Sequence, residues 1–185
     1  VFTVTDLAAS IKQQADYTII GTFGSHPSGN LYLLALVRKR MEGPDIMPAI
    51  QAAMKKWTSR FVMIESVAFQ LSMVQFARRA GLPVREMTRD KDKVARAYAA
   101  TPLMEEGSVL LPELATWLPD LLEELASFPN GKNDDQVDVM VDACNYWTGV
   151  RMKASQPLDF PSPDDDDMKS QRRDAFAGFK PRISR

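Results

Sequence analysis

The sequence predicts an α/β domain built on a mixed five-stranded sheet, in which three antiparallel strands are followed by parallel strands and helices flank the sheet. Three β-prone segments follow one another at the start of the chain, which is typical of an antiparallel meander. Later β-prone segments alternate with amphipathic helical segments, as in parallel strands joined by crossover helices. With 185 residues and 45% hydrophobic residues, the chain is long and apolar enough to bury one sizeable core.

The antiparallel part is predicted from three segments and the turns between them. Val1–Asp6 and Tyr17–Phe23 are strands separated by the polar turn Ala8–Ala15, and Leu31–Arg38 is the third strand. The connection His26–Asn30 holds a proline, a glycine and an asparagine, the residues that favour a hairpin turn.

The remaining elements alternate in type. A helix is predicted over Asp45–Thr58, where apolar residues recur at helical spacing, and the short apolar run Arg60–Glu65 is a strand. The elements expected after it are the helix Val67–Ala80, stopped by Gly81; the strand Pro83–Thr88; the helix Asp90–Thr101, ended by Pro102; the short strand Ser108–Leu111; and the helices Thr116–Ser127 and Asn133–Lys153. This order of elements is that of the ribonuclease H fold.

The chain divides into two regions of different composition. Residues 1–155 form the predicted domain, and residues 156–185 are expected to be a flexible tail that combines prolines, the acidic run Asp164–Asp167 and a basic end. Because Val1 lies inside a predicted strand, we expect the domain to be excised from a longer protein with a neighbour on its N-terminal side.

Composition excludes several classes of function. A single cysteine, Cys144, rules out an intramolecular disulfide framework and is expected to be a small buried residue, and a single histidine, His26, rules out zinc sites with several histidine ligands. No phosphate-binding glycine-rich loop, signal peptide or apolar run long enough to span a bilayer is present, so we expect an intracellular protein with no membrane partner. The net charge of -1 gives no overall signal for nucleic-acid binding.

Acidic residues stand where several predicted elements begin or end. Asp6 ends the first strand, Glu65 ends the fourth, and Asp134 and Asp135 open the last helix, where Asp138 lies on the same face as Asp135. A cluster of carboxylates is costly unless cations neutralise it, and hard divalent cations prefer oxygen ligands. The pattern therefore predicts a site for two Mg²⁺ or Mn²⁺ ions that hydrolyses phosphodiesters.

Several of the charged residues also have an ordinary structural explanation. Asp134 could only cap the last helix, and Asp16 could be either an auxiliary ligand near Asp6 or a solvated turn residue. Six basic residues near the predicted active edge could hold DNA phosphates, or could equally form a solvated face balanced by Asp90 and Asp92. These basic residues are Arg85, Arg89, Lys91, Lys93, Arg96 and Lys132.

Three segments resemble motifs of one protein family. TDLAASIKQQADYT resembles a first-strand acidic motif, MIESVAF a fourth-strand glutamate motif, and FPNGKNDDQVDVMVDA a Phe-Pro…Asp-Asp-x-x-Asp-Ala motif before the last helix. Together they make about residues 1–150 similar to the C-terminal nuclease domain of the large terminase subunit of tailed bacteriophages. One departure is Val139, where the family often has alanine, and it is expected to matter little.

This resemblance implies a metal-dependent endonuclease that cleaves concatemeric viral double-stranded DNA during genome packaging in the host cytoplasm. It implies Asp6, Glu65 and Asp135 as catalytic metal ligands, with Asp134, Asp138 and Asp16 as auxiliary ones. The implied partners are an N-terminal ATPase domain, the portal protein and the small terminase subunit, and the isolated domain is expected to be monomeric.

Two other functions fit the same residues. One is a nuclease similar to Holliday-junction resolvases. The other is a module that docks on portal or DNA and has little activity in isolation, for which the mixed-charge tail is the motivation.

Overall fold

The protein contains a six-stranded sheet with the strand order β5-β4-β1-β2-β3-β6. The computed structural model describes residues 1–8, 17–66 and 68–155. Residues Val1–Lys153 form one compact unit, and a second unit, Ala154–Arg185, lies almost wholly outside the described residues. The predicted ligand Asp16 and the predicted flexible tail also lie outside them. The strands are β1 (Phe2–Asp6), β2 (Thr18–Ser25), β3 (Leu31–Lys39), β4 (Val62–Glu65), β5 (Val84–Met87) and β6 (Val109–Leu110).

The pairing of the strands confirms the predicted fold class and adds one strand to it. β1, β2 and β3 are antiparallel to one another, whereas β4 lies parallel to β1 and β5 lies parallel to β4. The segment predicted as the short strand Ser108–Leu111 joins the sheet as β6, which pairs in parallel with β3, so the sheet has six strands where five were predicted. This strand has only two residues, and such a short segment joins a sheet through tertiary pairing more than through its own propensity.

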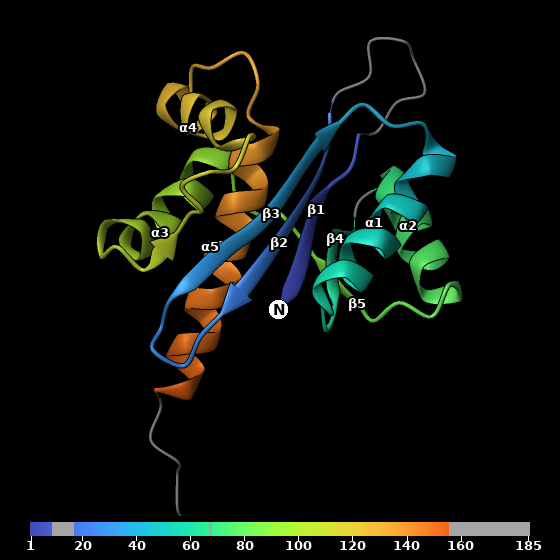
Figure 1. The fold of residues 1–185 in the computed structure, drawn as a ribbon, viewed down its shortest axis with the longest axis horizontal. Coiled ribbons are helices and arrows are strands. Elements are labelled where there is room, and N and C mark those ends of the chain that lie inside the picture. The colour runs from blue at the N-terminus through green and yellow to red at the C-terminus, as the bar shows by residue number, and fades with distance from the viewer. Residues whose placement is uncertain (9–16, 67, 156–185) are drawn as a thin grey trace, which may run out of the picture. The chain divides into compact units, whose positions relative to one another are not determined.

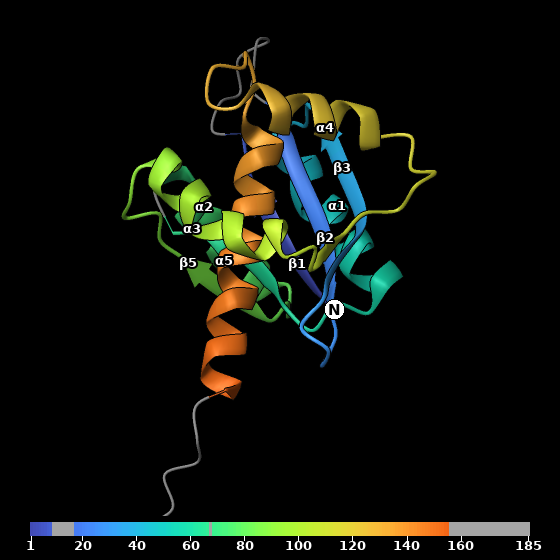
Figure 2. The same cartoon turned by 90° about the vertical axis from the view of Figure 1, so that its left-hand side faces the viewer.

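Helices cover both faces of the sheet (Figures 1 and 2). α1 and α2 lie on one face, and α3, α4 and α5 lie on the other (Figure 1). The helices are α1 (Gly43–Trp57), α2 (Ala68–Arg79), α3 (Lys93–Glu105), α4 (Leu118–Ser127) and α5 (Asp135–Ala154). Because successive side chains of a strand point to opposite faces, neighbours such as Ile19 and Ile20 belong to two different hydrophobic cores.

α5 packs across the sheet and carries the acidic residues of the last motif. Its segment Gln136–Cys144 is buried throughout. Gly21 of β2 permits this close approach, since a Cβ atom added at Gly21 would lie 2.6 Å from Cγ1 of Val139. The valine that departs from the family pattern is therefore accommodated by a glycine on the facing strand.

Two predicted boundaries of α3 were wrong. The helix begins at Lys93, because the side chain of Asp92 caps it by accepting a hydrogen bond from the backbone N–H of Ala95 at 2.9 Å. It also continues past Pro102 to Glu105, where Leu103 is buried in the core. The apolar contact of Leu103 keeps the helix in place although the proline removes one backbone donor.

Within the part of the chain that the structure describes, no helix is long and apolar enough to cross a bilayer. Cys144 is fully buried, as predicted.

Candidate metal centre

Asp6 and Glu65 end two adjacent parallel strands at the same edge of the sheet. Val4 of β1 pairs with Met63 of β4, and each acidic residue follows two positions later. Parallel strands that end together bring their terminal side chains together, which is where α/β folds commonly build sites. Both carboxylates accept a hydrogen bond from the same nitrogen, Nη1 of Arg89, at 2.9 Å for Asp6 and 3.0 Å for Glu65. The sequence prediction that these two residues become neighbours is therefore confirmed.

α5 brings a second set of carboxylates toward the same edge. Asp134 and Asp135 lie at its N-terminus and are partly exposed, whereas Asp138 and Asp142 are buried. Burial raises the pKa of Asp135, and the nearby charge of Asp6 at the end of β1 raises it further.

Three basic side chains, from the loop after β5 and the first turn of α3, point into this acidic cluster. Arg89 donates from Nε and Nη2 to Asp142 at 3.1 and 2.8 Å, in addition to its bonds to the strand ends. Lys93 lies 2.6 Å from carboxylate oxygens of both Asp134 and Asp138. Arg96 bridges Asp138 at 2.6 Å and Asp142 at 2.9 Å.

The pKa directions show that burial of the carboxylates outweighs the effect of the cations beside them. Burial raises the pKa values of Asp6 and Glu65 above their ordinary values, although Arg89 acts in the opposite direction. Burial, followed by the charges of Asp6, Glu124 and Asp134, raises the pKa of Asp135 to about 6. Burial acts to lower the pKa of Arg89, but the charges of Asp6, Asp142 and Asp138 raise it, so this guanidinium stays charged. A further positive charge at this edge would be stabilised.

The donor atoms fit a hard divalent cation in kind, because the cluster consists of carboxylate oxygens. Within residues 1–8, 17–66 and 68–155, however, no three acidic, histidine or cysteine side chains are grouped so that they could hold a metal ion. The positions of the carboxylates explain this result, because Asp6, Glu65 and Asp142 all point to the Arg89 guanidinium. The guanidinium of Arg89 already occupies the position at which these three carboxylates converge.

The six predicted DNA-contact residues fall into two groups. Arg89, Lys93 and Arg96 point into the acidic cluster, and the side chains of the two arginines are each only 12% exposed. Lys91 and Lys132 are exposed. Arg85 is also exposed, but it lies over the ring of Phe61 at 4.3 Å and donates to the hydroxyl of Tyr146 at 3.3 Å.

One residue that supports the site was missed from the sequence. Glu124 of α4 is buried and accepts hydrogen bonds from the backbone N–H groups of Gln136 and Val137 at 2.6 and 3.4 Å. Glu124 therefore caps the N-terminus of α5 from another helix and fixes the start of α5 at Asp135. The available signal was a glutamate inside the apolar stripe formed by Leu121 and Leu125, since a charged residue there must find a partner.

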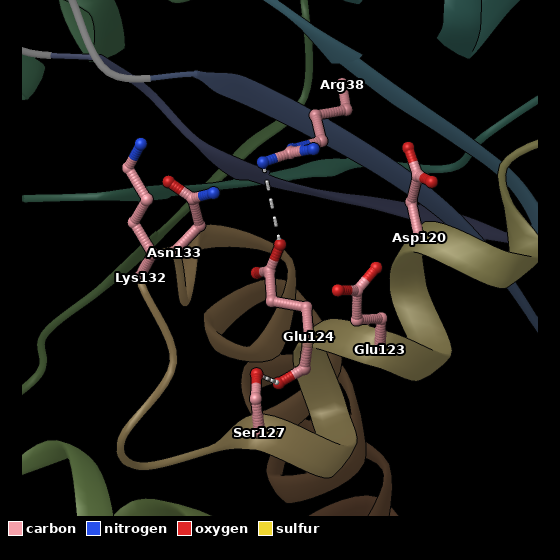
Figure 3. Close-up of a pocket in the computed structure, with 7 residues that line it drawn as sticks. All are labelled: Arg38, Asp120, Glu123, Glu124, Ser127, Lys132 and Asn133. Atoms are coloured by element: carbon pink, nitrogen blue, oxygen red, sulfur yellow. Dashed lines mark hydrogen bonds and ion pairs between the residues drawn. The ribbon is translucent and has the colours of Figure 1, made fainter.

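Glu124 also lies in a polar cavity of about 230 Å³ next to the last motif (Figure 3). Arg38 of β3 approaches its carboxylate at 3.9 Å from the opposite wall (Figure 3). Lys132 and Asn133, which immediately precede the paired aspartates, line the same cavity (Figure 3). β3, α4 and the loop before α5 thus meet at this cavity.

The mixed sheet and the carboxylates at its edge define a ribonuclease H-like α/β domain. Residues 4–146 match the model of the family described as "Terminase RNaseH-like domain". The chain belongs to this family. A search of curated protein sequences finds no match.

Solved structures share the same fold at low sequence identity. The large terminase nuclease from the thermophilic phage G20c with bound zinc is 20% identical with a TM-score of 0.57, over 78% of this chain and 80% of that chain. The large terminase nuclease domain of Thermus phage P74-26 is 17% identical with a TM-score of 0.57, over 78% of each chain. The large terminase of the thermophilic bacteriophage D6E in complex with ADP is 13% identical with a TM-score of 0.59 over 78% of this chain. The match spans only 39% of the D6E chain, which is a much longer protein.

Proposed function

We propose that this domain is the divalent-metal-dependent DNA endonuclease of a large terminase subunit, which cuts concatemeric viral double-stranded DNA during genome packaging. The observation that supports this most directly is the approach of Asp6, Glu65 and Asp135, which come from two strand ends and a helix start, to one edge of the sheet. Membership of the terminase family and the similarity of the fold to two terminase nuclease domains support the same reaction class.

Asp6, Glu65 and Asp135 would hold the metal ions, with Asp134 and Asp138 as auxiliary ligands. Two Mg²⁺ or Mn²⁺ ions would supply an activated water and would neutralise the charge on the phosphate and on the departing oxygen. The zinc of the G20c nuclease structure is consistent with a metal site in a protein of this fold.

The chain's own residues prepare this edge in two ways. The carboxylates supply a concentrated negative charge that repels a phosphate until cations are bound, so DNA is admitted only to the loaded site. Glu124 fixes the start of α5, and with it Asp135, relative to α4, and such fixed geometry is what a hydrolytic site requires.

Exposed basic residues are the best candidates for DNA contact. Lys91 and Lys132 lie on segments that flank the acidic cluster, and their side chains are free to reach phosphates. Arg85 is held against Phe61 and Tyr146 but remains exposed. Arg89, Lys93 and Arg96 could contact DNA only after giving up partners within the cluster.

The other components of the packaging machinery are proposed from family membership. The match to 39% of the D6E large terminase fits a nuclease domain that works beside an ATPase domain in one longer chain. The portal protein and the small terminase subunit would be its further partners.

Cleavage of supercoiled plasmid tests the proposed activity. We expect nicking and linearisation with Mn²⁺ or Mg²⁺ and none with EDTA, and we expect Asp6→Asn, Glu65→Gln and Asp135→Asn each to reduce the rate by at least about 100-fold. Asp120→Asn is the matched control, because Asp120 is an exposed aspartate on α4 outside the cluster. Metal-independent cutting, or equal loss of cutting in the control, would contradict the proposal.

A further inference from the structure

Arg89 binds the oxygen atoms that a metal ion would need. Its guanidinium spans three elements, with one nitrogen on Asp6 of β1 and Glu65 of β4 and two nitrogens on Asp142 of α5. It reaches them from the loop between β5 and α3, where Thr88 and Asp90 on either side are exposed.

A guanidinium and a metal ion cannot share these carboxylates in the same arrangement. The N–O distances to Asp6 and Glu65 are 2.9 and 3.0 Å, whereas Mg²⁺ requires its oxygen ligands at about 2.0–2.1 Å around a single point. Nη1 lies between the two oxygens, so an ion bound to both would overlap this nitrogen.

We infer that Arg89 is an internal counter-ion that holds the acidic site together without metal and is displaced when a divalent cation binds. This inference rests on the proposed metal-dependent function and describes how its site is regulated. Metal binding is then an exchange of one cation for another, and the apparent metal affinity is lowered by the cost of releasing Arg89.

If Arg89 leaves, the buried carboxylate of Asp142 on α5 keeps an ion pair with Arg96. Arg96 contacts Asp142 through a separate nitrogen at 2.9 Å, and it also pairs with Asp138. The charge balance favours the exchange as well. The cluster has six carboxylates and three basic side chains, so it formally keeps three excess negative charges while Arg89 is in place. The carboxylates are those of Asp6, Glu65, Asp134, Asp135, Asp138 and Asp142, and the basic side chains are those of Arg89, Lys93 and Arg96.

The opposite role for Arg89 makes the opposite prediction. If Arg89 were a permanent brace that positions Asp6 and Glu65 for metal, removing it would weaken metal binding. If Arg89 is a displaceable counter-ion, removing it strengthens metal binding and destabilises only the metal-free protein.

Titration of the EDTA-treated protein with Mn²⁺ alone, followed by calorimetry or by the electron paramagnetic resonance of free Mn²⁺, separates these roles. We expect Arg89→Gln to bind Mn²⁺ about tenfold more tightly than the wild type and to melt at a lower temperature in EDTA, with the difference reduced at saturating Mn²⁺. Arg78→Gln is the matched control, because Arg78 is an exposed arginine whose ion pair is with Glu86 and not with a carboxylate of the cluster. It is expected to leave Mn²⁺ affinity unchanged.

A measurement on the wild-type protein avoids dependence on a variant that could fail to fold. In EDTA the Nε–H of Arg89 should give a slowly exchanging NMR signal, because it is hydrogen-bonded to Asp142 in a side chain that is 12% exposed. Mg²⁺ should abolish this signal or shift it to the position of a solvated arginine, whereas the corresponding signal of Arg78 should not change.

Equal or weaker Mn²⁺ binding by Arg89→Gln, or an unchanged Arg89 signal at saturating Mg²⁺, would overturn the inference and leave the proposed nuclease function intact. Absence of Mn²⁺ binding by both proteins at millimolar concentration would overturn the inference and the proposed function together.

Discussion

Glu124 accepts a hydrogen bond from the backbone N–H of Gln136 at 2.6 Å, and its second carboxylate oxygen accepts one from the Gln136 side chain at 2.7 Å. The first residues of a helix have N–H groups with no partner inside the helix, and here a carboxylate from a neighbouring helix satisfies them. The negative charge also lies at the positive end of the α5 dipole. One buried residue thus joins α4 to the helix that carries Asp135.

Because Glu124 caps α5, we expect that removing its negative charge lowers the stability of the protein. Glu124→Gln should lower the free energy of unfolding by about 1–3 kcal/mol, because an amide is a weaker acceptor and its NH₂ group would face backbone donors. Urea denaturation measures this change. Glu123→Gln is the control, since Glu123 is exposed beside it on the same helix and should change stability by less than about 0.5 kcal/mol. Equal effects of the two substitutions would show that Glu124 does not act as a cap.

The contact between Gly21 and Val139 predicts a pair of compensating substitutions. Gly21→Ala should destabilise the protein by about 1–3 kcal/mol, because its new methyl group would lie 2.6 Å from Cγ1 of Val139 and force α5 away from β2. Val139→Ala removes that atom and should restore part of the loss in the double variant, as a double-mutant cycle by thermal denaturation would report. Purely additive effects would mean that the clash is relieved elsewhere.

The raised pKa of Asp135 predicts a pH dependence of the metal-free protein. In the folded state this pKa is about 6, above the ordinary value of 3.8, so the folded state binds a proton more tightly than the unfolded state. The stabilising effect of protonation is therefore fully present below about pH 4 and is lost as the pH rises through about 6. Because Asp135 is partly exposed, we expect a loss on the order of 1 kcal/mol between these limits.

Denaturation in EDTA from pH 4 to pH 7 can isolate this contribution by comparison with Asp135→Asn. The variant should be more stable than the wild type at pH 7, and the difference should shrink toward pH 4. Asp6 and Glu65 also have raised pKa values and remain in both proteins, so only the difference between the two curves is assigned to Asp135. Parallel curves would contradict the assignment.

The burial of Cys144 predicts a slow thiol reaction. Burial raises its pKa to about 12, so almost no thiolate is present at neutral pH, and the sulfur is shielded by the core. A disulfide reagent such as DTNB should label the native protein at least about 100-fold more slowly than the urea-unfolded protein. Because Cys144 is the chain's only cysteine, the reaction reports directly on opening of the core around α5. Rapid labelling of the native protein would show that this part of the core opens readily.

Local patterns in the chain were sufficient to predict the main elements. Strand alternation and helical spacing depend on residues close in sequence, so they located the ends of β1 and β4 and placed the start of α5 at Asn133, two residues before its observed start at Asp135. Asp6, Glu65 and Asp135 were candidate ligands for that reason, and the order of strands and helices then indicated that these three positions meet at one edge. Their role as metal ligands stays a prediction.

The partners of the charged residues were decided only by the tertiary structure. Arg89, Lys93 and Arg96 appeared as candidate DNA contacts because the sequence gives the sign of a charge but not its neighbour. Arg89 reaches Asp6 across a separation of 83 residues, and Arg96 reaches Asp138 across 42. Glu124 was missed for the same reason, since it serves the backbone of a segment 12 residues away. The sequence by itself determined which elements form and which acids stand at their ends, because those properties are local. The tertiary structure decided which cation faces which acid, because such pairing depends on how distant segments pack together.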